Sequence, residues 1–248
     1  MTGARHLAAR LVPAPVRRRW RARHETRSVG VPQPGQVRLG DLERLTPLDG
    51  RWGFGRGRPV DRHYIEDFLG RHRSDVHGRV LEIADDGYAR QFGRDLLSID
   101  VLHPVEGNPK ATIVGDLQAA PHIPDGAFDC AIVTQTLQMI WDVPAAITTL
   151  HRILAPGGVL LATVPGISKI SGYDSANWGD FWRFTESSAR RLASGGFGAD
   201  AVQIEAFGNV LTATAFLYGM ADTELTEEQL DHHDGNYQVL LAIRATKQ

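Results

Sequence analysis

A turn rich in carboxylates follows the first strongly apolar run of this sequence. The run ends near Glu82, and Asp85, Asp86 and Gly87 come directly after it. A dinucleotide site would hold several glycines here, because backbone amides and a helix N-terminus must receive a pyrophosphate. Two carboxylates beside a pyrophosphate repel it by roughly 4 kcal/mol per close pair at an effective dielectric near 20. The turn therefore favours a cationic ligand without phosphate and disfavours NAD.

Two further acids follow the next two apolar runs. Asp100 is predicted to end the second strand, about where an acidic residue can bind a ribose diol. Asp116 follows the third run, where its carboxylate or the adjacent backbone can meet an adenine edge. Ligands of open α/β sheets bind at the carboxyl ends of the strands. S-adenosylmethionine carries a sulfonium, an ammonium group, a ribose and an adenine but no phosphate, and it fits this series of acids.

Short apolar runs alternate with helical segments from residue 79 onward, and these elements must position the acids. Strands are predicted at residues 79–83, 96–99, 111–114, 127–133, 159–164, 202–206 and 238–245. Nearly continuous apolar strands that alternate with helices indicate a parallel sheet covered on both faces. The sequence thus predicts an α/β fold.

Capping residues predict the helices between these strands. The best-defined helix has Asp142 as its N-cap and Pro144 in its first turn, and it is predicted to end at Gly157 and Gly158. Four other helices are predicted to begin at Asp61, at Thr185 (running to Leu192), at Asn209 and at Thr226, which forms a capping box with Gln229.

The charge is distributed unevenly along the 248 residues. The formal net charge is −2, but residues 1–30 contain eight arginines and one acid, so the remaining residues carry −9. We expect residues 1–58 to form a basic arm and an irregular glycine-rich connector, and residues 59–248 to form the main domain. The arm could contact nucleic acid or a membrane surface, or extend into solvent. The acidic body argues against a nucleic-acid substrate.

Two function classes are disfavoured by composition. The only cysteine is Cys130, which excludes an intramolecular disulfide and a multi-cysteine zinc site. No apolar run approaches the roughly 18 residues needed to span a membrane. Residues 231–234 read Asp-His-His-Asp, but adjacent histidines point apart, so no metal site is predicted.

Residues 79–166 resemble the class I S-adenosylmethionine-dependent methyltransferases of the broad type 11 kind. The stretches RVLEIADDGYARQFG, LLSIDVLHP, ATIVGDL and FDCAIVTQTLQMIWDVPAAITTLHRILAPGGVLLATVPG carry this resemblance. It implies a Rossmann-like sheet of seven strands in the order 3-2-1-4-5-7-6, with the last strand antiparallel and helices on both faces. The segments NWGDFWRFTESSARRL and FGNVLTATAFLYG resemble a bacterial subgroup often encoded near glycosyltransferases. This implies a cytoplasmic enzyme acting on a small-molecule acceptor, such as a sugar-containing metabolite or a glycan.

For the cofactor, the resemblance together with the positions of the acids implies nine binding residues: Glu82, Ala84, Asp85, Gly87, Asp100, Val101, Asp116, Leu117 and Gln135. The family pattern is acid-x-Gly-x-Gly-x-Gly, whereas Ala84, Asp86 and Tyr88 stand at the three glycine positions here. Alanine is a mild change if its φ is negative, and aspartate adds bulk and charge. A methyltransferase-like binding or scaffold protein without catalysis is therefore the alternative function. A nicotinamide-dependent oxidoreductase on a related sheet is the third.

Aromatic residues near two strand ends are the candidates for binding the acceptor. They are Trp141, Trp178 and Trp182, with Arg183 as the partner of an anionic group. The same aromatics could instead pack among themselves as a lid. Methyl transfer is an in-line displacement in which placing the acceptor matters most, so a base is optional. His103 and Asp180 are the candidate bases.

Overall fold

The computed structural model describes residues 31–248. The chain divides into two compact units, Met1–Arg44 and Leu45–Gln248. The described part of the first unit contains one short 3-10 helix, η1 (Gly40–Glu43). The basic arm predicted for residues 1–30 lies outside the described residues. The second unit begins at Leu45, earlier than the boundary at residue 58 that the glycine-rich connector suggested.

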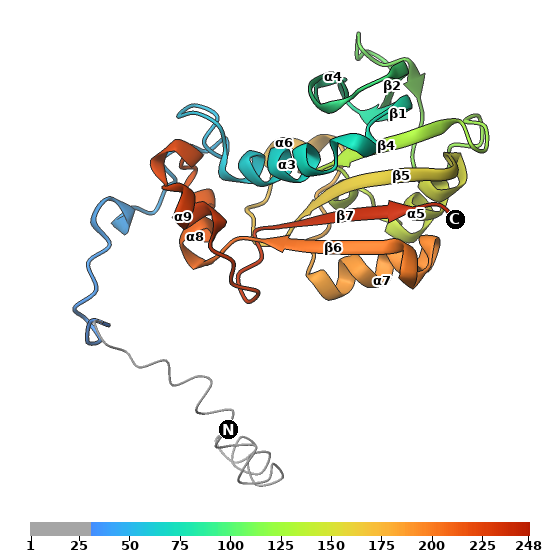
Figure 1. Cartoon of the computed structure of the whole chain (residues 1–248). Coiled ribbons are helices and arrows are strands. Elements are labelled where there is room, and N and C mark those ends of the chain that lie inside the picture. Colours follow the sequence, from blue (N-terminus) through green and yellow to red (C-terminus); the bar gives the residue numbers. More distant parts are fainter. Residues whose placement is uncertain (1–30) are drawn as a thin grey trace, which may run out of the picture. The chain divides into compact units, whose positions relative to one another are not determined.

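A seven-stranded sheet organises the second unit (Figure 1). Its strands are β1 (Gly78–Ile83), β2 (Leu96–His103), β3 (Ile113–Val114), β4 (Phe128–Thr134), β5 (Leu154–Pro165), β6 (Val202–Phe207) and β7 (Leu240–Thr246). Their spatial order is β3-β2-β1-β4-β5-β7-β6. The first five strands pair in parallel, and β7 runs antiparallel to both β5 and β6. The predicted fold class, strand order and antiparallel last strand are confirmed.

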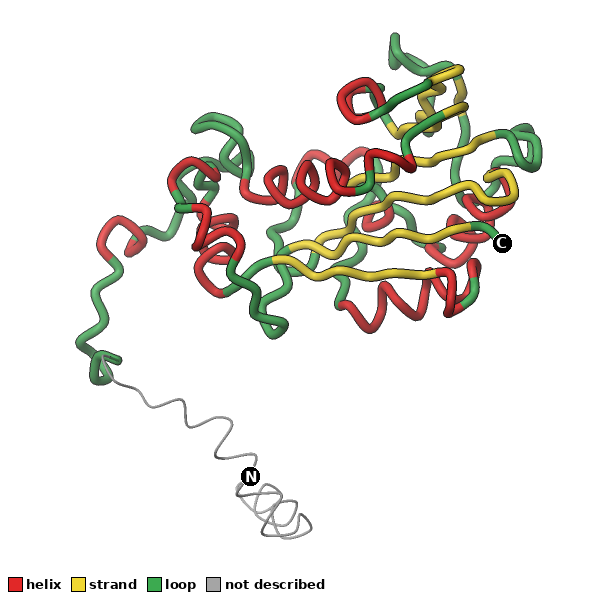
Figure 2. Tube along the Cα trace, viewed as in Figure 1, coloured by secondary structure: helices red, strands yellow, loops and turns green. Residues whose placement is uncertain are grey.

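Helices cover both faces of this sheet (Figure 2). On one face lie α5 (Val143–Ile153) and α7 (Glu186–Phe197). On the other lie α3 (Val60–Arg71), α4 (Gly87–Phe92) and α8 (Val210–Tyr218). The shorter helices are η2 (Arg73–Asp75), η3 (Leu137–Met139), α6 (Gly172–Asn177), η4 (Ala199–Ala201), η5 (Asp222–Glu224) and α9 (Glu227–Asp231).

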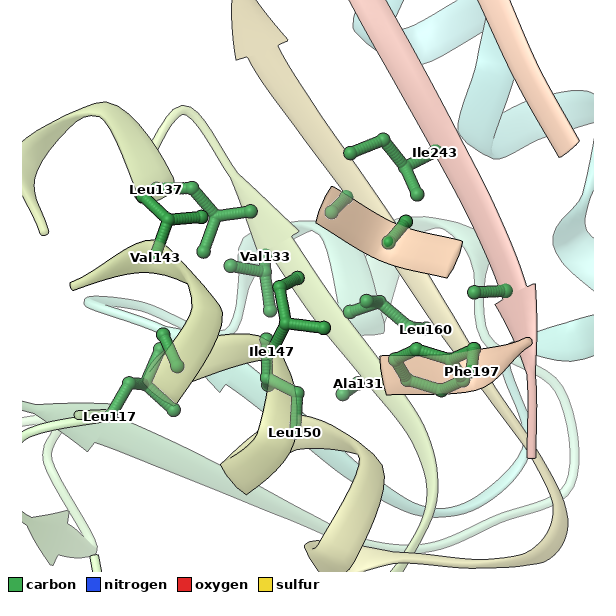
Figure 3. Close-up of a cluster of buried hydrophobic side chains, with 14 of the residues drawn as sticks. Leu117, Ala131, Val133, Leu137, Val143, Ile147, Leu150, Leu160, Phe197 and Ile243 are labelled. Carbon is green, nitrogen blue, oxygen red and sulfur yellow. The ribbon is translucent and has the colours of Figure 1, made fainter. Parts of the chain in front are cut away.

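Alternate residues of each central strand belong to two separate hydrophobic clusters, one on each face of the sheet. Leu160 faces α5 and α7, whereas its neighbour Leu161 faces α3 and α8. Figure 3 shows the first cluster, in which Ile147, Leu150 and Phe197 of the helices meet Ala131, Val133, Leu160 and Ile243 of the strands. Burial on both faces holds the sheet rigid, so the loops at its carboxyl edge are carried by fixed strands.

The helix caps confirm most of the local predictions. Asp142 accepts the Ala145 amide at 3.0 Å, and Thr185, Asn209 and Thr226 each cap the helix that follows. The prediction for Asp61 was wrong, because α3 begins at Val60 and Asp61 lies buried in its first turn.

Two predicted helix ends were also wrong. The helix after Asp142 ends at Ile153, because Leu154 already begins β5 and pairs with β4. Gly157, with φ of +81°, therefore lies within β5 rather than ending the helix. The helix capped by Thr185 continues to Phe197, since its apolar face packs on the sheet beyond the predicted end at Leu192.

Candidate functional site

A cavity of about 390 Å³ opens at the carboxyl ends of β1, β2 and β3. We call it the edge cavity, and its wall includes Ala84, His103, Asp116, Leu117, Ile140 and Trp178. Its position at the carboxyl edge of a parallel sheet is the position expected for a ligand site in this architecture.

Glu82 stabilises the turn beside this cavity through hydrogen bonds to its backbone. Its side chain is 2% exposed, and its two carboxylate oxygens accept the backbone amides of Tyr88 and Ala89 at 3.1 and 2.8 Å. These amides belong to the first turn of α4, whose N–H groups have no partner within the helix. Burial raises the pKa of Glu82 to about 7, against the opposing effect of the two amides. Glu82 therefore positions the turn and does not reach the edge cavity.

Ala84 keeps the backbone conformation that a glycine would supply. Its φ is +70°, in the left-handed region, so the condition for a mild substitution, a negative φ, is not met. Its amide donates to the Leu102 carbonyl at 3.0 Å, and its own carbonyl accepts from Asn108 Nδ2 at 2.7 Å. The turn thus retains its shape without the glycine, at a conformational cost of about 1–2 kcal/mol.

The two carboxylates of the turn are satisfied locally. Asp85 accepts the Gly87 amide at 2.8 Å. Asp86 pairs with Arg90 and with Lys110, whose Nζ lies 3.0 Å away, and these two cations lower the pKa of Asp86 to about 2. From the sequence, Asp85 and Asp86 were expected to be unopposed charges, but Asp86 pairs with two cations. The turn therefore repels a pyrophosphate less than the sequence suggested.

β2 ends later than predicted, and this moves Asp100 away from the edge cavity. The strand continues to His103, because its backbone still pairs with β1 and β3 there. Asp100 pairs instead with Leu81, in the body of the sheet, and its carboxylate accepts from Thr112 Oγ1 at 2.7 Å. Val101 is buried beside it. The residue that β2 presents to the cavity is His103.

Asp116 and Leu117 lie together in the cavity wall, on the loop after β3. Asp116 is exposed, and its two oxygens accept the backbone and side-chain amides of Gln118 at 2.8 and 2.9 Å. Gln118 in turn accepts the Asp142 amide at 2.9 Å, which ties this loop to the start of α5. A carboxylate and an adjacent backbone amide held in this way can recognise the edge of a nitrogenous ring.

A second, smaller cavity of about 200 Å³ shares Met139 with the wall of the first. We call it the inner cleft, and Arg62, Gln135, Gln138, Lys169, Asp180 and Arg183 belong to its wall. Trp52 and Phe54 also line it. Gln135, the first residue after β4, has φ of +47°, a strained value for a residue other than glycine.

The predicted acceptor-binding residues separate into three groups. Trp178 lines the edge cavity, and Arg183 lines the inner cleft. Trp141 and Trp182 stack on each other at the surface, 65% and 37% exposed, and line neither cavity. Arg183 forms two hydrogen bonds to the Asp180 carboxylate, at 2.5 and 2.9 Å.

The two candidate bases differ in their surroundings. Asp180 accepts from Arg183 and from the Ser171 amide at 2.8 Å, and Arg183 lowers its pKa, so its carboxylate is a weak proton acceptor. His103 Nδ1 lies 2.7 Å from the Val105 carbonyl and must donate to it, which leaves Nε2 as the basic nitrogen of the neutral ring. The His103 ring packs edge-on against Trp178, with centroids 5.4 Å apart.

Several residues of the inner cleft were not predicted from the sequence. Trp52 and Phe54 lie in the glycine-rich segment read as a connector, and Arg62 lies in the first turn of α3. Lys169 follows β5. Aromatics among glycines at residues 52–54 were the one available signal, because the other residues meet only through the folded chain.

Within residues 31–248, no group of three His, Cys, Asp or Glu side chains is arranged to hold a metal ion. No helix in that range combines the length and apolar character needed to cross a membrane. Cys130 is fully buried in β4 as a free thiol.

Residues 78–162 match a protein-family model described as a methyltransferase domain. A curated relative, the malonyl-[acyl-carrier protein] O-methyltransferase of Serratia marcescens, is 32% identical over 71 residues. The matched stretch is 29% of this chain and 26% of that enzyme, so the chain spans about a quarter of the length of this relative.

The fold is similar to that of a solved methyltransferase structure. An S-adenosylmethionine-dependent methyltransferase from Archaeoglobus fulgidus is 14% identical, with a TM-score of 0.50, over 75% of this chain and 94% of that chain. One from Mesorhizobium loti is 18% identical, with a TM-score of 0.48, over 76% of this chain and 98% of that chain. At these identities the similarity concerns the arrangement of strands and helices.

Proposed function

We propose that this chain, which carries a methyltransferase domain over residues 78–162, transfers a methyl group from S-adenosylmethionine to a small-molecule acceptor. The observation that carries the proposal is the pair of cavities at the carboxyl edge of the sheet, with Met139 in the wall of both. In this proposal one cavity holds the cofactor and the other the acceptor, and the reacting atoms meet beside Met139.

The edge cavity has the chemistry that an adenosyl group requires. Its wall combines apolar side chains, among them Leu117 and Ile140, with the polar edge of Asp116. In our proposal, Asp116 and the Leu117 backbone recognise the adenine, and Trp178 or Ile140 covers its face. The left-handed Ala84 brings the backbone of the turn against the cofactor. His103 replaces Asp100 as the β2 residue nearest the ribose.

The catalytic contribution of the chain is mainly one of placement. When bound, S-adenosylmethionine supplies a methyl group on a positively charged sulfur, which an acceptor atom can attack directly. The new bond to the methyl carbon forms as the carbon–sulfur bond breaks, and its electron pair stays on sulfur. Gln135 and Gln138 line the inner cleft and can orient the acceptor. A hydroxyl acceptor loses its proton to solvent or to a nearby basic side chain.

The size and lining of the inner cleft support a small acceptor with a face that can pack on aromatic rings. At about 200 Å³ the cleft suits a small group, and Trp52 and Phe54 offer aromatic surface of the kind that packs on sugar rings. We therefore propose a sugar-containing metabolite or the end of a glycan as the acceptor. That the chain is a bacterial, cytoplasmic enzyme stays a prediction from the sequence resemblance.

Calorimetric titration with S-adenosylhomocysteine tests the cofactor site. The wild type should bind it, Asp116→Ala should bind at least tenfold more weakly, and NAD should not bind. Asp200→Ala, which changes an exposed acid in η4, is the matched control and should bind like the wild type. Failure of the folded wild type to bind S-adenosylhomocysteine would refute the proposal and favour the scaffold alternative, whereas binding of NAD alone would favour an oxidoreductase.

A further inference from the structure

Arg62 presents an unused hydrogen-bond donor to the inner cleft. Its Nη1 is buried and has no hydrogen-bond partner. The Asp61 carboxylate lies 4.0 Å away, beyond hydrogen-bonding distance. A buried guanidinium nitrogen without a partner costs free energy, and an anionic oxygen in the cleft would remove that cost.

Lys169 is a second cation of the same cleft. Its Nζ lies over the Trp52 ring, 3.4 Å from the centroid, and its one hydrogen-bond contact is with the Ile170 carbonyl at 3.5 Å. Among the described residues it forms no salt bridge. Burial lowers the pKa of Lys169, and the attraction of the Asp174 and Asp180 carboxylates opposes this effect only in part.

Trp52 belongs to a segment that is hydrogen-bonded to distant parts of the chain, and its ring fixes the position of the Lys169 ammonium group. The segment at residues 45–59 that carries Trp52, which we call the strap, donates from the Leu48 amide to the Tyr218 carbonyl at 2.8 Å. Arg56 of the strap pairs with Glu224. The ammonium group of Lys169 is therefore directed by an aromatic ring that is itself fixed to the far end of the chain.

The other charges of the cleft leave these two cations available. Asp180 is already neutralised by Arg183. Burial raises the pKa of Asp61, which reduces its ability to compensate Arg62. Asp174 is the remaining carboxylate of the wall. Among the described residues, neither Arg62 nor Lys169 has a carboxylate within hydrogen-bonding distance, which leaves room for an anionic ligand.

Gln138 adds a complementary requirement. Its side chain is 9% exposed, and its Oε1 has no hydrogen-bond partner, whereas its Nε2 is directed at Gln135 Oε1 at 3.4 Å. A buried carbonyl oxygen of this kind needs a donor. A ligand that gives partners to Arg62, Lys169 and Gln138 therefore carries both an anionic group and a hydroxyl or amine hydrogen.

We infer that the inner cleft selects an anionic, hydroxyl-bearing acceptor, namely an acidic or phosphorylated sugar, whose anionic group binds Arg62 and Lys169 and whose hydroxyl donates to Gln138. This inference rests on the proposed function, since it assigns the substrate class of the same site. It makes Lys169 and Arg62 the residues that determine specificity.

The test uses three defined probes on the full chain saturated with S-adenosylhomocysteine: D-glucuronate, D-glucose 6-phosphate and D-glucose. Calorimetry should show that at least one of the two anions binds ten times more tightly than glucose, and their order separates carboxylate from phosphate recognition. Lys169→Gln and Arg62→Gln should each weaken that binding at least tenfold. Arg191→Gln, which removes an exposed arginine of α7, is the control and should change nothing.

The inference is overturned if neither anion binds, if glucose binds as tightly as both, or if Lys169→Gln binds the anions like the wild type. The affinity for S-adenosylhomocysteine is measured in the same samples. If the wild type does not bind it, the proposed function fails. If the wild type binds S-adenosylhomocysteine but binds the anions no more tightly than glucose, only the proposed substrate class fails. If Arg62→Gln fails to fold, Lys169→Gln still tests the inference. Lys169 lies in a partly exposed loop outside the edge cavity, so its substitution should leave the fold intact.

Discussion

Trp182 stacks on Trp141 with ring centroids 5.3 Å apart and ring planes 29° apart, and its Nε1 donates to the Ile140 carbonyl at 3.0 Å. The pair joins the segment after β4 to the segment after β5. The backbone strengthens this connection, because the Phe181 amide donates to the Gln138 carbonyl at 2.8 Å. Ile140 lines the edge cavity and Gln138 the inner cleft, so the contact holds one wall of each cavity.

Trp182→Ala should therefore lower the free energy of unfolding by about 1–3 kcal/mol, the sum of a lost aromatic pair and a lost hydrogen bond. It should also weaken binding of S-adenosylhomocysteine. Trp182→Phe keeps a stacked ring without the Nε1 donor and should lose about half as much. Chemical denaturation and calorimetry measure the two effects. Unchanged stability in Trp182→Ala would show that the pair is not a structural link.

Ala84→Gly should stabilise the protein by up to about 1 kcal/mol. The alanine has φ of +70°, where a Cβ costs about 1–2 kcal/mol, and the greater chain entropy of glycine in the unfolded state offsets part of the gain. Ala84→Val should destabilise strongly, since a β-branched side chain tolerates this region least. Thermal unfolding of the three proteins gives the order; a glycine variant less stable than the valine variant would contradict it.

Glu82 should make stability depend on pH between about 4.5 and 7. Burial raises its pKa to about 7 in the folded protein from 4.5 in the unfolded chain, so its protonated form is favoured on folding. Its contribution is complete below pH 4.5 and is lost as the pH rises to 7, by about 3 kcal/mol in total.

Glu82→Gln removes this titration but has one oxygen for the Tyr88 and Ala89 amides. It should be less stable than the wild type by about 1–3 kcal/mol at pH 4.5. Because only the wild type loses stability as the pH rises to 8, the difference should shrink to zero or change sign. Urea denaturation across this range measures the difference, and Glu228→Gln, an exposed change in α9, should show no such trend. A constant difference between Glu82→Gln and wild type would contradict the raised pKa.

Cys130 should react with a thiol reagent only after unfolding. Its side chain is fully buried in β4, and burial raises the pKa of its thiol well above the usual range. Absorbance after addition of dithionitrobenzoate should show no labelling of the native protein and one thiol per chain in guanidinium. Cys130→Ser should cost more stability than Cys130→Ala, because the serine hydroxyl would be buried in an apolar strand without a hydrogen-bond partner. Rapid labelling of the native protein would contradict this.

The sequence by itself determined the elements that depend on near neighbours. Asp142, Thr185 and Thr226 cap helices because their side chains reach amides three residues away, and such contacts are visible in the sequence. The apolar runs also located all seven strands, because strands covered on both faces appear in the sequence as nearly continuous apolar runs. The strand order was available only through resemblance to a family, since spacing alone does not determine which strands pair.

Only the tertiary structure decided which residues face the two cavities. The sequence placed the end of β2 before the polar Asp100, but pairing with β1 and β3 carries the strand on to His103. Trp52 and Lys169 come from a glycine-rich strap and a loop after β5, and they meet because the strap is hydrogen-bonded to the end of α8. Contacts between distant segments depend on packing of the whole sheet, and no local pattern records them.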